Sequence, residues 1–227
     1  MPMATFIPRS MLTVNVDCMA GEERLIYESI CYKLANYTLD GIKPLALSLI
    51  KETGNLILMA YVADPMQINE FLIDIIRSTE GVIETTTYIR HGLIALVEDP
   101  AHLIEEGFSP DNDRYNAFVM IDLIPGWERE VDKALCDLPT TDGVIPVMMS
   151  FCFHDDDTDM ILELSGITED AILEYVINYV RPIEGIIDTD TETLSETTLF
   201  TSPRVITDTT DEIEAEGDTM PEPAEEE

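Results

Sequence analysis

The chain has 227 residues, of which 46 are Asp or Glu and 12 are Lys or Arg, so its formal net charge is -34. A surface this negative repels nucleic-acid phosphates and anionic lipids, because affinity for both comes largely from Lys and Arg. The composition therefore excludes direct binding to nucleic acid or to an anionic membrane, and it favours cationic partners or a salty cytoplasm.

The sequence carries no targeting signal that we can identify. No apolar run approaches the roughly 20 residues that span a bilayer, and the first residues lack the charged start and apolar core of a secretory signal. We therefore expect a cytoplasmic protein. The four cysteines (Cys18, Cys31, Cys136 and Cys152) have no Cys-x-x-Cys spacing, so we expect free thiols. Cys31 and Cys136 hold equivalent positions in two predicted helices and are expected in the core.

The sequence repeats itself at an offset of 102 to 105 residues. Residues 40–48 read DGIKPLALS and residues 142–150 read DGVIPVMMS, so Asp, Gly, Pro and Ser match. Residues 80–83 (EGVI) match residues 184–187 (EGII) in the same way. The offset changes only where loops are expected, which is typical of a structural repeat.

Each copy is predicted to contain six elements in the order β-α-β-β-α-β. Apolar runs bounded by turn residues predict the strands, at 12–17, 43–49, 55–62 and 82–89 in the first copy and at 117–123, 145–153, 159–164 and 186–194 in the second. The first helix of each copy shows an apolar face, formed by Ile26, Ile30 and Leu34 or by Val131, Ala134 and Leu135.

The second helix of each copy has apolar residues at i, i+3, i+4, i+7 and i+8, the pattern of an amphipathic helix. These residues are Ile68, Phe71, Leu72, Ile75 and Ile76 in the first copy and Ile172, Tyr175, Val176, Tyr179 and Val180 in the second. Asp64 and Thr168 lie in the predicted N-cap regions, and Gly81 and Gly185 are expected to end the helices.

This order predicts an α+β fold made of two ferredoxin-like βαββαβ repeats, at residues 10–90 and 116–196. Each repeat would leave one sheet face open, and the two open faces would cover each other in a barrel-like pseudo-dimer, the dimeric α/β barrel arrangement within one chain. The connector at 91–115 holds the apolar stretch LIALV, a candidate strand swapped across the pair. Residues 202–227 are expected to be an acidic disordered tail.

Several motifs of the second copy, taken in order and spacing, resemble the effector-binding (RAM) domain of Lrp/AsnC regulators. They are AFVMI at 117–121, PG at 125–126, DMILEL at 159–164 and RPIEGIIDT at 181–189. The resemblance covers about 117–194 and reaches 12–89 mainly through the repeat. It implies a dimeric α/β barrel that senses an amino acid or a related small molecule. Only about eleven residues precede the first strand, so the chain resembles a stand-alone tandem version without a helix-turn-helix.

The resemblance also implies a ligand loop of the form Gly-x-(Tyr/Phe)-Asp at the start of the third strand. The corresponding residues are Asp157, Thr158 and Asp159 in the second copy and Gly54 and Asn55 in the first. The second copy keeps the Asp but not the Gly or the aromatic residue, and the first has Asn in place of Asp. The alternative for Asp159 and Asn55 is a turn residue that caps its own backbone.

The remaining candidates for chemistry are few. Residues 154–159 (HDDDTD) offer oxygens to a hard cation but lack the spacing of an EF-hand, so a solvated hairpin tip is the alternative. Tyr88, Arg90 and His91 are of the kinds used by haem-pathway decarboxylases of this fold, but no second His is near in sequence. There is no recognisable nucleophile–base motif.

The sequence therefore predicts a regulatory module that binds a small molecule, with no catalytic residues, no cofactor and no metal. The expected effector is an amino acid or a related metabolite, and the expected partner is a second copy or a related RAM-domain protein. An oligomerising scaffold whose acidic tail binds a basic partner is the alternative. A ferredoxin-like enzyme is the third and least supported reading.

Overall fold

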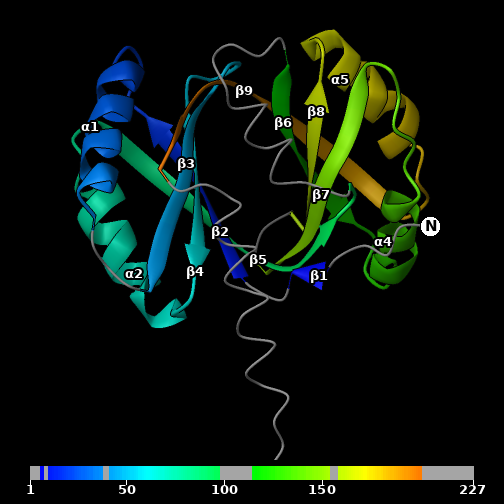
Figure 1. Cartoon of the computed structure of the whole chain (residues 1–227), viewed down its shortest axis with the longest axis horizontal. Helices are drawn as coiled ribbons and strands as arrows, with labels where there is room; N and C mark the ends of the chain where they lie inside the picture. Colours follow the sequence, from blue (N-terminus) through cyan, green and yellow to red (C-terminus); the bar gives the residue numbers. More distant parts are fainter. Residues whose placement is uncertain (1–5, 8–9, 38–40, 98–113, 154–157, 201–227) are drawn as a thin grey trace, which may run out of the picture.

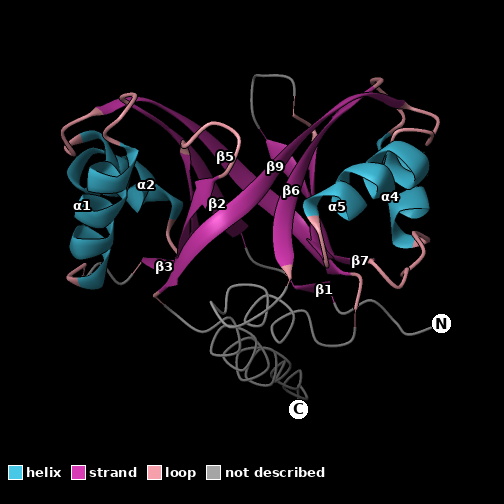
Figure 2. Cartoon of the chain, turned by 90° about the horizontal axis from the view of Figure 1, so that it is seen from above, coloured by secondary structure: helices cyan, strands magenta, loops and turns pink. Residues whose placement is uncertain are grey.

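The computed structural model describes residues 6–7, 10–37, 41–97, 114–153 and 158–200 (Figure 1). They form one antiparallel sheet with helices on its outer faces (Figure 2). None of the helices in these ranges is long and apolar enough to cross a membrane. The predicted tail and residues 98–113 of the predicted connector lie outside the described residues.

Each half of the described chain has the element order β-α-β-β-α-β. The first half contains β2 (Ser10–Cys18), α1 (Glu23–Ala35), β3 (Ile42–Ile50), β4 (Leu56–Val62), α2 (Ile68–Phe71) and β5 (Val82–Ala95), preceded by the short β1 (Phe6–Ile7). The second contains β6 (Tyr115–Leu123), α4 (Glu128–Cys136), β7 (Val144–Phe153), β8 (Met160–Gly166), α5 (Glu169–Tyr175) and β9 (Ile186–Leu199).

The second helix of each half begins at a predicted cap. The Asp64 carboxylate accepts a hydrogen bond from the Met66 amide at 3.0 Å, and the Thr168 hydroxyl accepts one from the Ala171 amide at 3.1 Å. A 3-10 turn, η1 (Pro65–Gln67), precedes α2. Beyond α2 and α5 the chain widens into π-helical turns, η2 (Leu72–Arg77) and η3 (Val176–Val180).

The sheet closes on itself through strands of both halves. The hydrogen-bonded order is β5-β2-β4-β3-β9-β6-β8-β7, β5 also pairs with β7, and β1 adds to β5. The pairing of β5 with β7 uses residues 89–95, and that of β9 with β3 uses residues 194–199. Leu93 to Ala95 are therefore a continuation of β5 rather than an extra strand, and Leu96 and Val97 lie beyond its end.

Successive residues of each strand alternate between a core under the helices and a core inside the barrel. On β2, Leu12, Val14 and Val16 pack under the helices of the first half, while Met11 packs inside the barrel. The second half has its own core under α4 and α5. The barrel core contains Met11, Leu45, Ala46, Ile50, Ile57, Met59, Tyr88, Leu93, Phe118, Met120, Val147, Met148, Ile161 and Leu194.

The prediction that Cys31 and Cys136 are core thiols is wrong for Cys136, which is exposed. The buried stripe of α4 is formed by Val131 and Leu135, and the next residue along a helix turns about 100° away from that stripe. Cys31 is partly buried against the core of the first half. No pair among the four cysteines forms a disulfide.

Candidate functional site

A buried arginine stands inside the barrel core. The Arg90 side chain, on β5, is 0% exposed and lies 2.7 Å through Nη1 from Oε1 of Glu163 on β8. This is an ion pair at contact distance, although its angles are not those of a hydrogen bond. Arg90 Nε donates a hydrogen bond to the Ser150 hydroxyl at 2.7 Å, and its guanidinium carbon is 5.9 Å from the centre of the Phe118 ring. The Arg90–Glu163 ion pair therefore joins β5 of the first half to β8 of the second.

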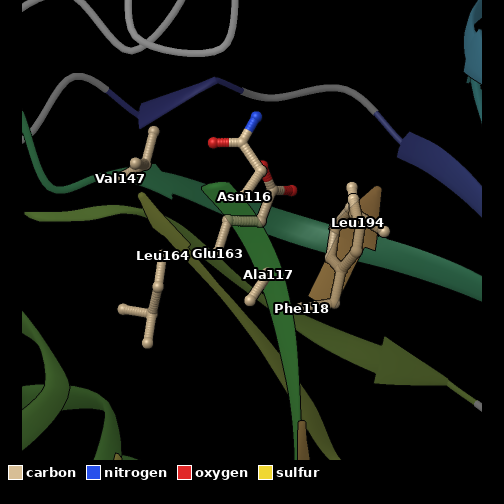
Figure 3. Close-up of a pocket in the computed structure, with 7 residues that line it drawn as sticks. All are labelled: Asn116, Ala117, Phe118, Val147, Glu163, Leu164 and Leu194. Atoms are coloured by element: carbon tan, nitrogen blue, oxygen red, sulfur yellow. The ribbon is translucent and has the colours of Figure 1, made fainter. Parts of the chain in front are cut away.

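A small cavity lies beside this ion pair. It has a volume of about 10 Å³, and its lining includes Asn116, Phe118 and Glu163 together with apolar residues of β6, β7, β8 and β9 (Figure 3). A space of this size holds about one water molecule. Arg90 Nη2 has no hydrogen-bond partner among the described residues.

A second polar pair occupies the barrel next to Phe118. Asn15 on β2 donates through Nδ2 to Oε1 of Glu192 on β9, at 3.5 Å. The other oxygens of this pair, Asn15 Oδ1 and Glu192 Oε2, are buried and have no partner among the described residues. In the sheet register, Phe118 is the cross-strand partner of both Glu163 and Glu192. The two polar groups therefore flank one aromatic residue.

The surroundings of Glu192 keep a proton on its carboxyl group. Burial, and then the negative charges of Asp190, Glu52 and Asp17, raise the pKa of Glu192 to about 8. Burial disfavours the charged form, and like charges nearby do the same. A carboxyl group with this pKa can give or take a proton near neutral pH, which is the property of a general acid or base.

Glu192 lies where the barrel begins to open. Residues 186–193 of β9 pair with β6 alone among the described strands, and pairing with β3 begins at Leu194. The turn after β3 lies alongside, because the Lys51 amide donates to the Thr193 carbonyl at 2.9 Å. Figure 2 shows the two halves of the sheet spreading apart toward the top of the view. Glu192 as a whole residue is half-buried, whereas its Oε2 atom is buried.

The predicted ligand-loop residues lie at the turns between strands. Asn55 Oδ1 accepts from the Cys18 amide at 3.1 Å, and Asp159 Oδ2 accepts from the Leu123 amide at 2.7 Å. Both acceptors hold a backbone amide 36 or 37 residues earlier in the chain, so neither bond is the expected cap on the residue's own turn. Thr158 is 9% exposed. Gly54 adopts φ +74°, a left-handed conformation that favours glycine.

Asp157 and the rest of the 154–157 cluster lie outside the described residues. Whether Asp159 or Asn55 also contacts a ligand stays a prediction. The described residues hold no group of three or more His, Cys, Asp or Glu side chains that could bind a metal ion.

Among the described residues, Tyr88, Arg90 and His91 do not surround a space of haem size. His91 pairs through Nδ1 with the Ser10 hydroxyl at 2.9 Å. Tyr88 and Arg90 are packed in the barrel core, beside a cavity of about 10 Å³. The three residues therefore do not form the haem-pathway site considered from the sequence.

The comparisons with known proteins identify the fold. No protein-family model and no curated protein matches the sequence. A candidate monooxygenase from Lactobacillus acidophilus NCFM matches over 86% of this chain and 98% of its own, with a TM-score of 0.55 and 10% identity. An anthrone oxidase-like protein matches over 86% and 94%, with a TM-score of 0.60 and 12% identity.

A third match is chlorite dismutase from Candidatus Nitrospira defluvii in complex with imidazole, over 88% of this chain and 94% of that chain, with a TM-score of 0.51 and 11% identity. Identities this low show the fold alone. The chain has the ferredoxin-like α+β barrel fold on which these proteins are built.

These matches correct the family prediction. The structures matched are monooxygenase-like and chlorite dismutase proteins, so the expected Lrp/AsnC effector domain is wrong, as are the amino-acid sensor and the transcription regulation inferred from it. The misleading motifs, such as Pro125-Gly126 and Glu184-Gly185, stand at turns and helix ends, which any βαββαβ unit needs. The expectation that the chain is not an enzyme is also overturned, because the neighbours are named for enzymes.

Sequence reasoning named Arg90 but missed Glu163, Glu192 and Asn15. One signal was available, because Glu163 is the charged residue in the otherwise uncharged run MILELSG of β8, and a charge there must find a partner. The partner of Glu192 could not be found in this way, since Asn15 is 177 residues away along the chain.

Proposed function

We propose that the chain is an enzyme that removes a proton from a small organic substrate inside the barrel, with Glu192 as the base. The observation that carries this proposal is the Glu192–Asn15 pair. It combines a carboxyl pKa of about 8 with two buried oxygens that have no partner in the part of the chain that the structure describes. Strongly perturbed pKa values in recessed sites are typical of catalytic groups. Asn15 would hold the carboxyl group in position.

The fold supports the same class of reaction. An oxidase or monooxygenase that acts on an activated C–H bond begins by removing its proton, and a base with a pKa near 8 suits that step. Phe118, next to Glu192 in the register, is the apolar residue beside the proposed base. Arg90, on the other side of Phe118, would stabilise negative charge that develops on a substrate oxygen.

The test is carbon-bound deuterium exchange. The full chain is incubated in deuterated buffer with a panel of neutral, anionic and ammonium-bearing ketones, and the exchange next to each carbonyl is followed by proton NMR. Wild-type protein should catalyse exchange with at least one class, at a rate that rises with pH through about 8. Glu192→Gln should lower that rate roughly 100-fold or more.

Glu130→Gln is the matched control, because it also removes one carboxylate, but from the exposed side of α4. Its exchange rate should equal that of wild type. Exchange that is absent across the panel, or equally fast in Glu192→Gln, contradicts the proposed function.

We also infer that the two halves are repeats of one unit, with domain limits near residues 10–90 and 116–196. Equivalent contacts recur in both and support this inference. Arg77 Nε donates to Thr85 Oγ1 at 2.9 Å, as Arg181 Nε does to Thr189 Oγ1 at 2.8 Å. The register also shifts at the same place in both, just after Pro44 and just after Pro146.

A further inference from the structure

We propose that the substrate is a small organic cation whose ammonium group binds between Glu192 and Asn15. This inference rests on the proposed function and names the class of its substrate.

Three buried oxygens belong to residues on the inner face of the barrel. Glu192 Oε2, Asn15 Oδ1 and Thr13 Oγ1 have no hydrogen-bond partner among the described residues. Thr13 is 2% exposed and lies two residues before Asn15 on β2, so both side chains share the inner face. The inner position of Thr13 also follows from its cross-strand partners Met59 and Tyr88, which belong to the barrel core.

An ammonium group matches these atoms. It carries three N–H donors and no acceptor, and the site offers a carboxylate oxygen, an amide oxygen and a hydroxyl oxygen. A carboxylate-bearing substrate would leave the same oxygens facing another acceptor. A neutral alcohol would supply one donor and would leave the other oxygens without a partner.

The charges around the Glu192–Asn15 pair also favour a cationic substrate. Asp17 on β2, Glu52 on the turn after β3 and Asp190 on β9 are the charged groups that act on Glu192, and all three are acidic. Their field attracts a cation and repels an anion. All three are exposed, so the field extends toward solvent.

Binding of the cation would also ionise the carboxyl group of Glu192, the proposed base. In the free protein the Glu192 carboxyl keeps its proton near neutral pH. A bound ammonium group favours the charged form of a carboxyl group beside it, so Glu192 would release its proton to solvent as the cation binds. The substrate would then face an ionised carboxylate, which can accept a proton from carbon.

The experiment measures binding and proton release together. The full chain is titrated calorimetrically at about pH 7 with propylammonium, and with propanol and propionate as neutral and anionic probes of similar size. Repeating the titration in two buffers of different ionisation enthalpy gives the number of protons released. Wild-type protein should bind one propylammonium, release close to one proton, and bind neither propanol nor propionate.

The variants separate this site from the general acidity of the surface. Glu192→Gln should weaken propylammonium binding at least tenfold and abolish proton release. Thr13→Val should weaken binding and keep the release, and Glu130→Gln should behave as wild type. Binding of propanol at equal strength, the absence of saturable binding, or unchanged release in Glu192→Gln would overturn the proposal.

A separate carbon-13 titration of the Glu192 carboxyl group in the free protein distinguishes the two ideas. An ordinary pKa for Glu192 would contradict both the proposed function and the inference about the substrate. A raised pKa without amine binding removes only the inference about the substrate.

Discussion

Glu192 shows how position changes the chemistry of a single residue. A glutamate in solution loses its proton with a pKa near 4.5, whereas burial and three neighbouring acids raise the pKa of Glu192 to about 8. At a pH between these two pKa values, Glu192 is protonated in the folded state and ionised in the unfolded state. The stability that this proton contributes is complete below pH 4.5 and is lost as the pH rises through about 8.

Glu192→Gln should therefore change the dependence of stability on pH. Near pH 4 the variant and wild type should have equal free energies of unfolding, because Gln resembles the protonated acid. Above pH 8 the variant should be more stable, by on the order of 2 kcal/mol once solvent screening is allowed for. Urea unfolding at both pH values measures the difference, and an equal effect at both would contradict the raised pKa.

The Arg90–Glu163 pair is the second residue-scale case. Arg90→Met should lower the free energy of unfolding by about 3–5 kcal/mol, because it leaves the Glu163 carboxylate buried without its counter-charge. The double variant Arg90→Met/Glu163→Leu should recover much of that loss, since no buried charge remains. Urea unfolding of both single variants and the double variant gives the coupling energy. A double variant as unstable as the sum of the singles would show that the pair is not coupled.

At the scale of elements, the turn residues Asn55 and Asp159 hold the start of one strand against the end of another. Asp159→Ala should cost about 1–2 kcal/mol, because the Leu123 amide loses its acceptor. Asp159→Asn should cost much less, since Asn55 already makes the equivalent bond to the Cys18 amide. Thermal unfolding compares the two variants, and equal losses would assign the effect to the charge of Asp159 rather than to the hydrogen bond.

The elements were largely predictable because their signals are local. Asp64 and Thr168 cap the second helices as expected, and each predicted strand overlaps one of β2 to β9, those for β4 and β8 starting one residue early. The errors lie at strand ends. β5 and β9 run on to Ala95 and Leu199, because those residues pair with strands of the opposite half, and a partner that is far along the chain leaves no local pattern.

At the scale of the whole molecule, the barrel core is shared by both halves. Met11 and Met59 of the first half and Phe118 and Met148 of the second belong to one buried cluster. Residues 1–97 or 114–227 alone would expose this apolar face to water, so each fragment should self-associate, whereas the two expressed together should form a soluble 1:1 complex. Sedimentation analysis distinguishes these states. Two fragments that are each monomeric and folded would contradict a shared core.

The sequence by itself determined the α+β class, the order of elements in each half, the helix caps and the strong negative charge, because each depends on neighbouring residues or on composition. Only the tertiary structure decided the meeting of Arg90 with Glu163 and of Asn15 with Glu192. The first pair joins β5 to β8 and the second joins β2 to β9, so both arise from closure of the barrel. Closure also buries Glu192 among other acids, and that burial gives an ordinary carboxyl group the proton affinity of a catalytic base.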